Sequence, residues 1–129
     1  MQIRRWAALL LLTIGGTGAA MSHARADQAD DLVVMTYNVR YASDTPPNSW
    51  PQRLPVTVAM IEEYQPDVIG TQETLYRQAK DLDRELPGYG WIGLGREGGS
   101  RGEMMAIFYR HERLEPLEFD HYWLSDTPE

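Results

Sequence analysis

The sequence predicts an α/β fold, because a short apolar strand, an amphipathic helix and a second apolar strand follow one another. Residues 32–37 and 67–72 are apolar and rich in β-branched side chains, as expected for buried strands. Between them, residues 52–64 carry apolar side chains at the spacing of one helix face. Because a crossover helix returns the chain in the same direction, these elements predict a βαβ unit with parallel strands.

The connection between the first strand and the helix is expected to be irregular. Residues 42–51 contain three prolines, interspersed with other turn-forming residues. Asn48 or Ser49 is expected to cap the helix. Pro55 comes early enough to lie in the first helical turn or just before it, where a proline is tolerated.

The second part of the chain predicts another helix and a pair of strands. Residues 75–86 place apolar side chains at steps of three and four among charged ones, which is typical of an amphipathic helix. Residues 89–94 and 104–109 favour strands, and the glycine-rich segment between them predicts a hairpin. Aromatic residues within 113–124 favour one more strand, although their periodicity is mixed.

The amino-terminal segment, residues 1–26, has the three parts of a secretory signal peptide. Arg4 and Arg5 give a positive start, residues 6–14 are apolar, and residues 24–26 form an Ala-x-Ala cleavage site. A membrane anchor is the alternative, but the apolar run is shorter than the roughly 20 residues that cross a bilayer. We therefore expect cleavage and export, to the periplasm or outside the cell, with no membrane span afterwards.

The charge of the mature chain favours small ligands over polyanions. Removal of the signal leaves 9 basic and 19 acidic residues, a net charge of −10. Such a charge opposes tight non-specific binding to nucleic acid or to an anionic membrane. The chain contains no cysteine, so export adds no disulfide and the core must be stable without one.

Asn38 and Glu73 directly follow the two parallel strands of the predicted βαβ unit. The carboxyl ends of parallel strands meet at one edge of the sheet, where open α/β folds bind ligands. A carboxylate there can hold a hard cation such as Mg²⁺, and an amide can orient a phosphate oxygen. The spacing also fits an alternative in which the two polar residues merely end their strands.

Three segments carry more specific motifs: Val-Met-Thr-Tyr-Asn-Val-Arg at 34–40, Gln-Pro-Asp-Val-Ile-Gly-Thr-Gln-Glu at 65–73, and Gly-Glu-Met-Met-Ala-Ile-Phe-Tyr-Arg at 102–110. In sequence, order and spacing they resemble the opening motifs of the endonuclease/exonuclease/phosphatase superfamily, the DNase I-like proteins. The resemblance extends over about residues 32–126. It implies a four-layer α/β sandwich with two mixed β-sheets, of which residues 27–129 form the amino-terminal portion, with the second half missing.

The resemblance also implies a phosphoesterase that uses Mg²⁺ or Mn²⁺ and an activated water. Glu73 matches the family's metal-binding glutamate, and Asn38 matches the asparagine that positions the phosphate and supports the metal site. Arg40 stands where many DNA-acting members have an acidic residue, so it is either a phosphate-binding residue or a surface arginine paired with a carboxylate. Glu103 matches a position near the rim of the active site, and its alternative is an ordinary charge at the start of a strand.

Of two later motifs of the family, Asp-x-Asn does not occur in this sequence, and the Asp120-His121 pair does not match the family's final Asp-His motif. We therefore expect an exported, metal-dependent phosphoesterase that is represented only by its amino-terminal half and is inactive as it stands. The alternatives are a non-catalytic module that binds a metal or a phosphorylated ligand, and a gene fragment without an independent role. Nuclease, sugar- or inositol-phosphate phosphatase and phospholipid phosphodiesterase all stay open, and the negative charge favours a small phosphate ester over a polynucleotide.

Other candidates are weaker. Arg96 and Arg101 lie in the glycine-rich loop, which is expected to be a solvated hairpin loop or, alternatively, a phosphate contact. His111 and His121 match no family motif and are expected to be surface or packing residues.

Overall fold

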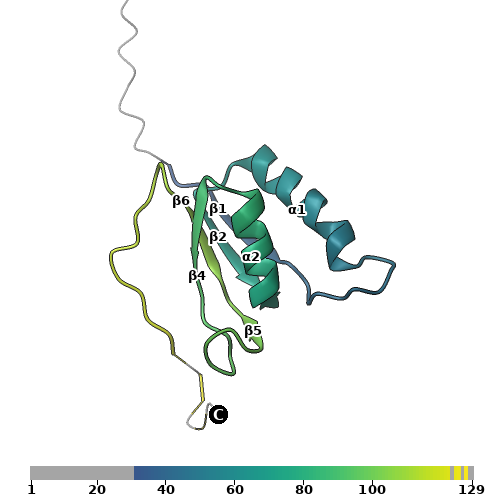
Figure 1. The fold of residues 1–129 in the computed structure, drawn as a ribbon. Helices are drawn as coiled ribbons and strands as arrows, with labels where there is room; N and C mark the ends of the chain where they lie inside the picture. Colours follow the sequence, from purple (N-terminus) through teal and green to yellow (C-terminus); the bar gives the residue numbers. More distant parts are fainter. Residues whose placement is uncertain (1–30, 123, 126, 128–129) are drawn as a thin grey trace, which may run out of the picture.

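A computed structural model describes residues 31–122, 124–125 and 127, and it confirms an α/β fold with mixed sheets (Figure 1). The predicted signal peptide at residues 1–26 lies outside the described residues. The elements in chain order are β1 (Val34–Asn38), α1 (Trp50–Tyr64), β2 (Val68–Gln72), β3 (Thr74–Leu75), α2 (Tyr76–Glu85), β4 (Tyr89–Ile92), β5 (Glu103–Met104) and β6 (Ile107–Arg110).

The main sheet has four strands in the order β1-β2-β6-β4. β1 and β2 are parallel, which confirms the βαβ unit, and β6 is antiparallel to both of its neighbours. β4 and β6 therefore form the expected hairpin pair. A separate two-stranded ladder joins β3 to β5 next to the carboxyl end of β2.

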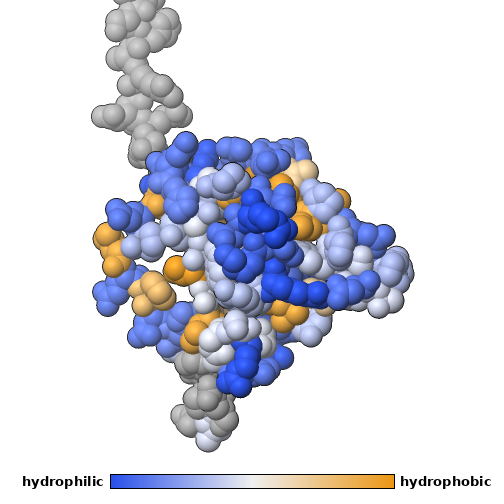
Figure 2. Space-filling model, viewed as in Figure 1, coloured by the Kyte–Doolittle hydropathy of each residue, from blue (hydrophilic) through white to orange (hydrophobic). Residues whose placement is uncertain are grey.

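The core lies between this sheet and the two helices. Met35, Ile69, Phe108 and Trp91 are paired in register across the four strands, so their side chains share one face. Ile69 and Phe108, on the two central strands, are 0% and 1% exposed, which makes them the centre of the core. α1 and α2 cover this face, and α2 presents a hydrophilic outer surface to solvent (Figures 1 and 2).

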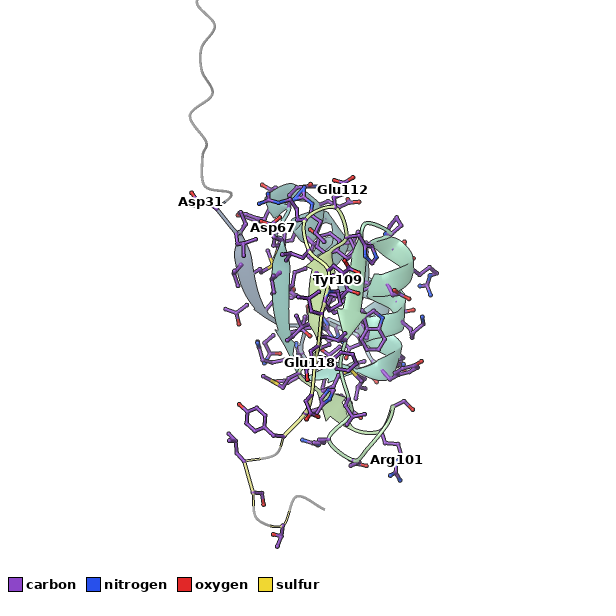
Figure 3. The ribbon with its side chains drawn as sticks, turned by 90° about the vertical axis from the view of Figure 1, so that its left-hand side faces the viewer. Asp31, Asp67, Arg101, Tyr109, Glu112 and Glu118 are labelled. Atoms are coloured by element: carbon purple, nitrogen blue, oxygen red, sulfur yellow. The ribbon has the colours of Figure 1, made fainter. Side chains whose placement is uncertain are left out.

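The opposite face of the sheet carries exposed apolar side chains, among them Val34 on β1 and Ile107 on β6. The chain after β6 passes over this side, and Glu118 lies in front of the sheet in the view of Figure 3. The prediction of a further strand within 113–124 is wrong for the described residues, which contain no regular element there. Leu117 is 93% exposed, so this segment makes too few apolar contacts to fix a strand register.

Several boundaries also differ from the prediction, most of all at the first helix and the last strand. α1 begins at Trp50, because Ser49 caps it and the Ser49 N–H donates to Gln52 Oε1 at 3.1 Å. Pro55 consequently lies inside the helix rather than in its first turn. The expected strand at 104–109 is split into β5 and β6, because Glu103 and Met104 pair with β3 instead of β4.

Candidate metal and phosphate site

The carboxyl ends of β1 and β2 bring Asn38 and Glu73 into direct contact. Asn38 is the last residue of β1, its partner in register is Gln72, and Glu73 follows immediately. The Asn38 side-chain Nδ2 donates a hydrogen bond to Glu73 Oε1 at 2.7 Å. The expected meeting of these two side chains at one sheet edge is confirmed.

The backbone after β1 completes the arrangement around Glu73. The Tyr41 N–H donates to Glu73 Oε2 at 3.0 Å, and the Arg40 N–H donates to Asn38 Oδ1 at 2.7 Å. Arg40 and Glu73 both have φ near 57°, in the left-handed region that non-glycine residues seldom adopt. Such conformations persist only where the surroundings enforce them, and they cluster at functional sites.

These contacts favour the ionised form of Glu73. The hydrogen bond from Asn38 holds the pKa of the Glu73 carboxyl below its ordinary value, assisted by the Tyr41 N–H and by the positive charge of Arg40. Desolvation opposes this shift but does not outweigh it. The site therefore presents a carboxylate at neutral pH, with each of its oxygens oriented by one donor.

Arg40 has an exposed side chain that makes no hydrogen bond or ion pair within the described part of the chain. The expected alternative, a pairing with a nearby carboxylate, is therefore not formed there. Its positive charge contributes to the lowering of the Glu73 pKa.

Glu103 lines the same cavity as Glu73. This cavity has a volume of about 390 Å³, and its wall also contains the Arg96, His121 and Met104 side chains. Arg96 Nη1 lies 3.1 Å from Glu103 Oε2, so the rim carries an ion pair. The sequence did not predict that pairing or the place of His121, because both depend on how the glycine-rich loop and the segment after β6 fold.

The residues at this sheet edge suit a divalent cation whose other ligands are water and phosphate. Within residues 31–122, 124–125 and 127, no three His, Cys, Asp or Glu side chains lie close enough together to hold a metal. Mg²⁺ nevertheless binds commonly through one or two carboxylates, with waters and substrate phosphates as its other ligands. Glu73 supplies one such ionised carboxylate, and Asn38 orients it.

The residues that hold the loop after β1 were not predicted. Arg53 on α1 donates to the carbonyl oxygens of Val39, Arg40 and Tyr41, and Gln78 on α2 also donates to Arg40 O, at 3.0 Å. The sequence shows only that Arg53 lies on the predicted helix, because its contacts depend on the path of an irregular loop.

Comparison with known proteins places this geometry in a family. The Endonuclease/Exonuclease/phosphatase family matches residues 35–127, which include Asn38, Arg40, Glu73 and Glu103. None of the curated protein sequences matches the chain at a significant level.

Solved structures agree with this assignment. A mannosyl-6-phosphatase from Bacteroides thetaiotaomicron is 40% identical with a TM-score of 0.71, over 75% of this chain and 38% of that protein. An endonuclease/exonuclease/phosphatase from Bacteroides vulgatus is 34% identical with a TM-score of 0.72, over 76% of this chain and 38% of that protein. A conserved protein of unknown function from Enterococcus faecalis is 26% identical with a TM-score of 0.68, over 74% of this chain and 38% of that protein.

The chain thus spans well under half the length of these relatives and corresponds to one part of their fold. On the family match and on identities of 34–40% with two solved structures, the chain belongs to the endonuclease/exonuclease/phosphatase family.

Proposed function

We propose that this chain carries the Asn38–Glu73 part of a divalent-metal-dependent phosphoesterase that acts on a small phosphate ester. The observation that carries the proposal is the ionised Glu73 carboxylate, oriented by Asn38 Nδ2 at 2.7 Å and by the Tyr41 N–H at 3.0 Å. A preorganised carboxylate at the carboxyl edge of a sheet is suited to a hard cation.

Each residue of the site has a separate role in this proposal. Glu73 would hold Mg²⁺ or Mn²⁺, which when bound polarises a phosphoryl oxygen and offsets negative charge on the phosphate. Asn38 keeps Glu73 in place, and Arg40 offers a guanidinium to the remaining phosphate oxygens. Glu103 and Arg96 line the same cavity as Glu73, so they would contact the sugar portion of the substrate.

Two observations favour a sugar phosphate over a polynucleotide as the substrate. A relative with 40% identity is a mannosyl-6-phosphatase, and the site cavity of about 390 Å³ suits a small ligand. The net charge of the whole sequence is −7, which disfavours a long polyanion.

Export belongs to the proposal as well. It depends on the signal-like residues 1–26, which lie outside the described part of the chain. Among the described helices, none is long and apolar enough to span a bilayer.

Calorimetric titration with mannose 6-phosphate tests the proposed function. We expect mannose 6-phosphate to bind in the presence of Mg²⁺ and to bind weakly in EDTA, because the cation would coordinate the phosphate. We expect no binding of mannose, which has no phosphate. We also expect a shallower salt dependence for the sugar phosphate than for any binding of a single-stranded oligonucleotide, which releases several counterions. Turnover by this chain is not expected, since it contains no Asp-x-Asn motif and its Asp120-His121 pair does not match the family's final Asp-His motif.

Equal affinity with Mg²⁺ and with EDTA would contradict the metal-dependent reading. If the chain bound the oligonucleotide tightly with a steep salt dependence and did not bind mannose 6-phosphate, the proposed substrate would be a polynucleotide instead of a sugar phosphate.

A further inference from the structure

We infer that Arg53, which lies on α1 outside the site, positions the metal-binding carboxylate by fixing the loop of residues 39–41. This inference rests on the proposed function, because it concerns how the same Glu73 side chain is held. Arg53 is a positioning residue, since its partners are backbone oxygens of the loop rather than Glu73 itself.

One guanidinium binds three consecutive carbonyl groups of this loop. Arg53 Nη1 donates to Val39 O, and Nη2 donates to Arg40 O and Tyr41 O, each at 3.2 Å. Its Nε donates to Asn48 O at 2.9 Å, which ties the same side chain to the segment before α1.

The Arg53 side chain is itself held firmly. It is half-buried, and its guanidinium carbon lies 5.3 Å from the centre of the Trp50 ring. Trp50 is 3% exposed, and its indole nitrogen donates to Asp81 on α2 at 2.8 Å. The loop is therefore attached, through Arg53 and Trp50, to the packed pair of helices.

The same loop residues form the donors at the site. Arg40 and Tyr41 turn their carbonyl oxygens to Arg53 and their N–H groups to Asn38 and Glu73. Arg40 does so with φ of 57°, a conformation that needs external support in a non-glycine residue. Arg53 supplies that support on one side of the loop while the metal-site side chains lie on the other.

Gln78 reinforces the arrangement from α2. Its side chain is 0% exposed, its Nε2 donates to Arg40 O at 3.0 Å, and its Oε1 accepts from the Leu75 N–H at 3.0 Å. Arg40 O is thus held from both helices, which restricts the peptide plane that also contains the Tyr41 N–H.

A lysine cannot reproduce these contacts. The planar guanidinium directs several donors in a fixed fork, whereas an ammonium group is a compact charge on a flexible stem. Arg53→Lys keeps the positive charge and most of the aliphatic stem but removes the planar set of donors. Any effect of this variant is therefore due to the lost donor geometry and not to a lost charge.

Metal-free ¹H–¹⁵N NMR of the chain tests the inference in Arg53→Lys and Arg53→Gln. We expect hydrogen exchange of the Tyr41 amide to accelerate roughly tenfold or more, as its bond to a carboxylate weakens, and the Asn38 side-chain amide signals to shift. We further expect Mn²⁺ affinity to fall by roughly 10- to 100-fold, as for other residues that support a metal ligand. The Ile69 amide in β2 should keep its protection, which shows that the sheet is intact.

Arg77→Gln is the matched control. Arg77 donates to the carbonyl just after this loop, Ala42 O at 3.1 Å, and pairs with Asp44 at 3.0 Å. The described backbone hydrogen bonds to the side chains of Asn38 and Glu73 come from Arg40 and Tyr41 and not from Ala42. We expect the Tyr41 and Asn38 signals and the Mn²⁺ affinity of this variant to equal those of the wild type. Arg53→Lys alone decides the comparison if Arg53→Gln does not fold.

Unchanged Tyr41 exchange and Asn38 signals in Arg53→Lys would overturn the inference, as would equal effects in Arg77→Gln. The test is independent of the proposed function, because the NMR readout needs no metal. A wild-type chain that binds no Mn²⁺ would refute the metal site and leave the loop result standing. A wild-type chain that binds Mn²⁺, with both Arg53 variants unchanged, would refute the inference alone.

Discussion

Replacing Glu73 by alanine is expected to weaken Mn²⁺ binding by roughly 100-fold or more. Loss of a residue that only supports a metal ligand typically costs 10- to 100-fold in affinity, and Glu73 is the proposed ligand itself. The substitution also leaves the Asn38 Nδ2 and Tyr41 N–H donors without their carboxylate partner. Isothermal titration calorimetry of both proteins with Mn²⁺ measures the effect.

Glu63→Ala is the control for Glu73→Ala. Glu63 is an exposed glutamate on α1, so the variant has the same change of type and charge without affecting the sheet edge. Its Mn²⁺ affinity should stay within about twofold of the wild type, since distant exposed charges are screened. Equal losses in the two variants would mean that the cation responds to overall charge and not to the Asn38–Glu73 pair.

Replacing Phe108 by alanine is expected to lower the free energy of unfolding by about 3–5 kcal/mol. Phe108 is 1% exposed on the central strand β6, and its ring stacks with Trp91 at a centroid distance of 6.2 Å. The truncation removes buried apolar contacts and leaves a cavity that the sheet and helices cannot fully close. Because natural domains have total stabilities of only about 5–15 kcal/mol, the loss approaches complete unfolding. Urea denaturation followed by circular dichroism measures it.

Phe119→Ala provides the matched comparison for this stability prediction. Phe119 is 60% exposed in the segment after β6, so the same chemical truncation should change the free energy of unfolding by no more than about 0.5 kcal/mol. If the two variants were destabilised equally, Phe108 would not be the centre of the core.

The parts of the fold that the sequence predicts correctly are those set by continuous apolar runs. The runs at 32–37 and 67–72 are long enough to identify β1 and β2, and the helical spacing between them identifies α1. Because two parallel strands end at the same edge, the contact between Asn38 and Glu73 follows from the sequence as well. The family motifs then extend the prediction to the wider fold and to the roles that we propose for these residues.

The parts that were missed depend on long-range geometry. β3 and β5 have two residues each, too few for any periodic signal. They form only because the segment after Glu73 lies next to residues 103–104 in the folded chain. The left-handed backbone of Arg40 and Glu73 has no marker in the sequence, since neither residue is glycine. The contacts of Arg53 follow from that backbone, so they become visible only in the folded structure.

The central claim is that a divalent cation binds at the carboxyl edge of the main sheet, where Asn38 and Glu73 lie. Paramagnetic broadening by Mn²⁺ in ¹H–¹⁵N spectra of the chain tests it most directly, because the broadening falls off steeply with distance from the ion. We predict that substoichiometric Mn²⁺ broadens the Asn38, Tyr41 and Glu73 signals first and that EDTA restores them. Broadening that begins instead on α2, around Asp83 and Glu85, with Asn38 and Tyr41 unaffected, would contradict it.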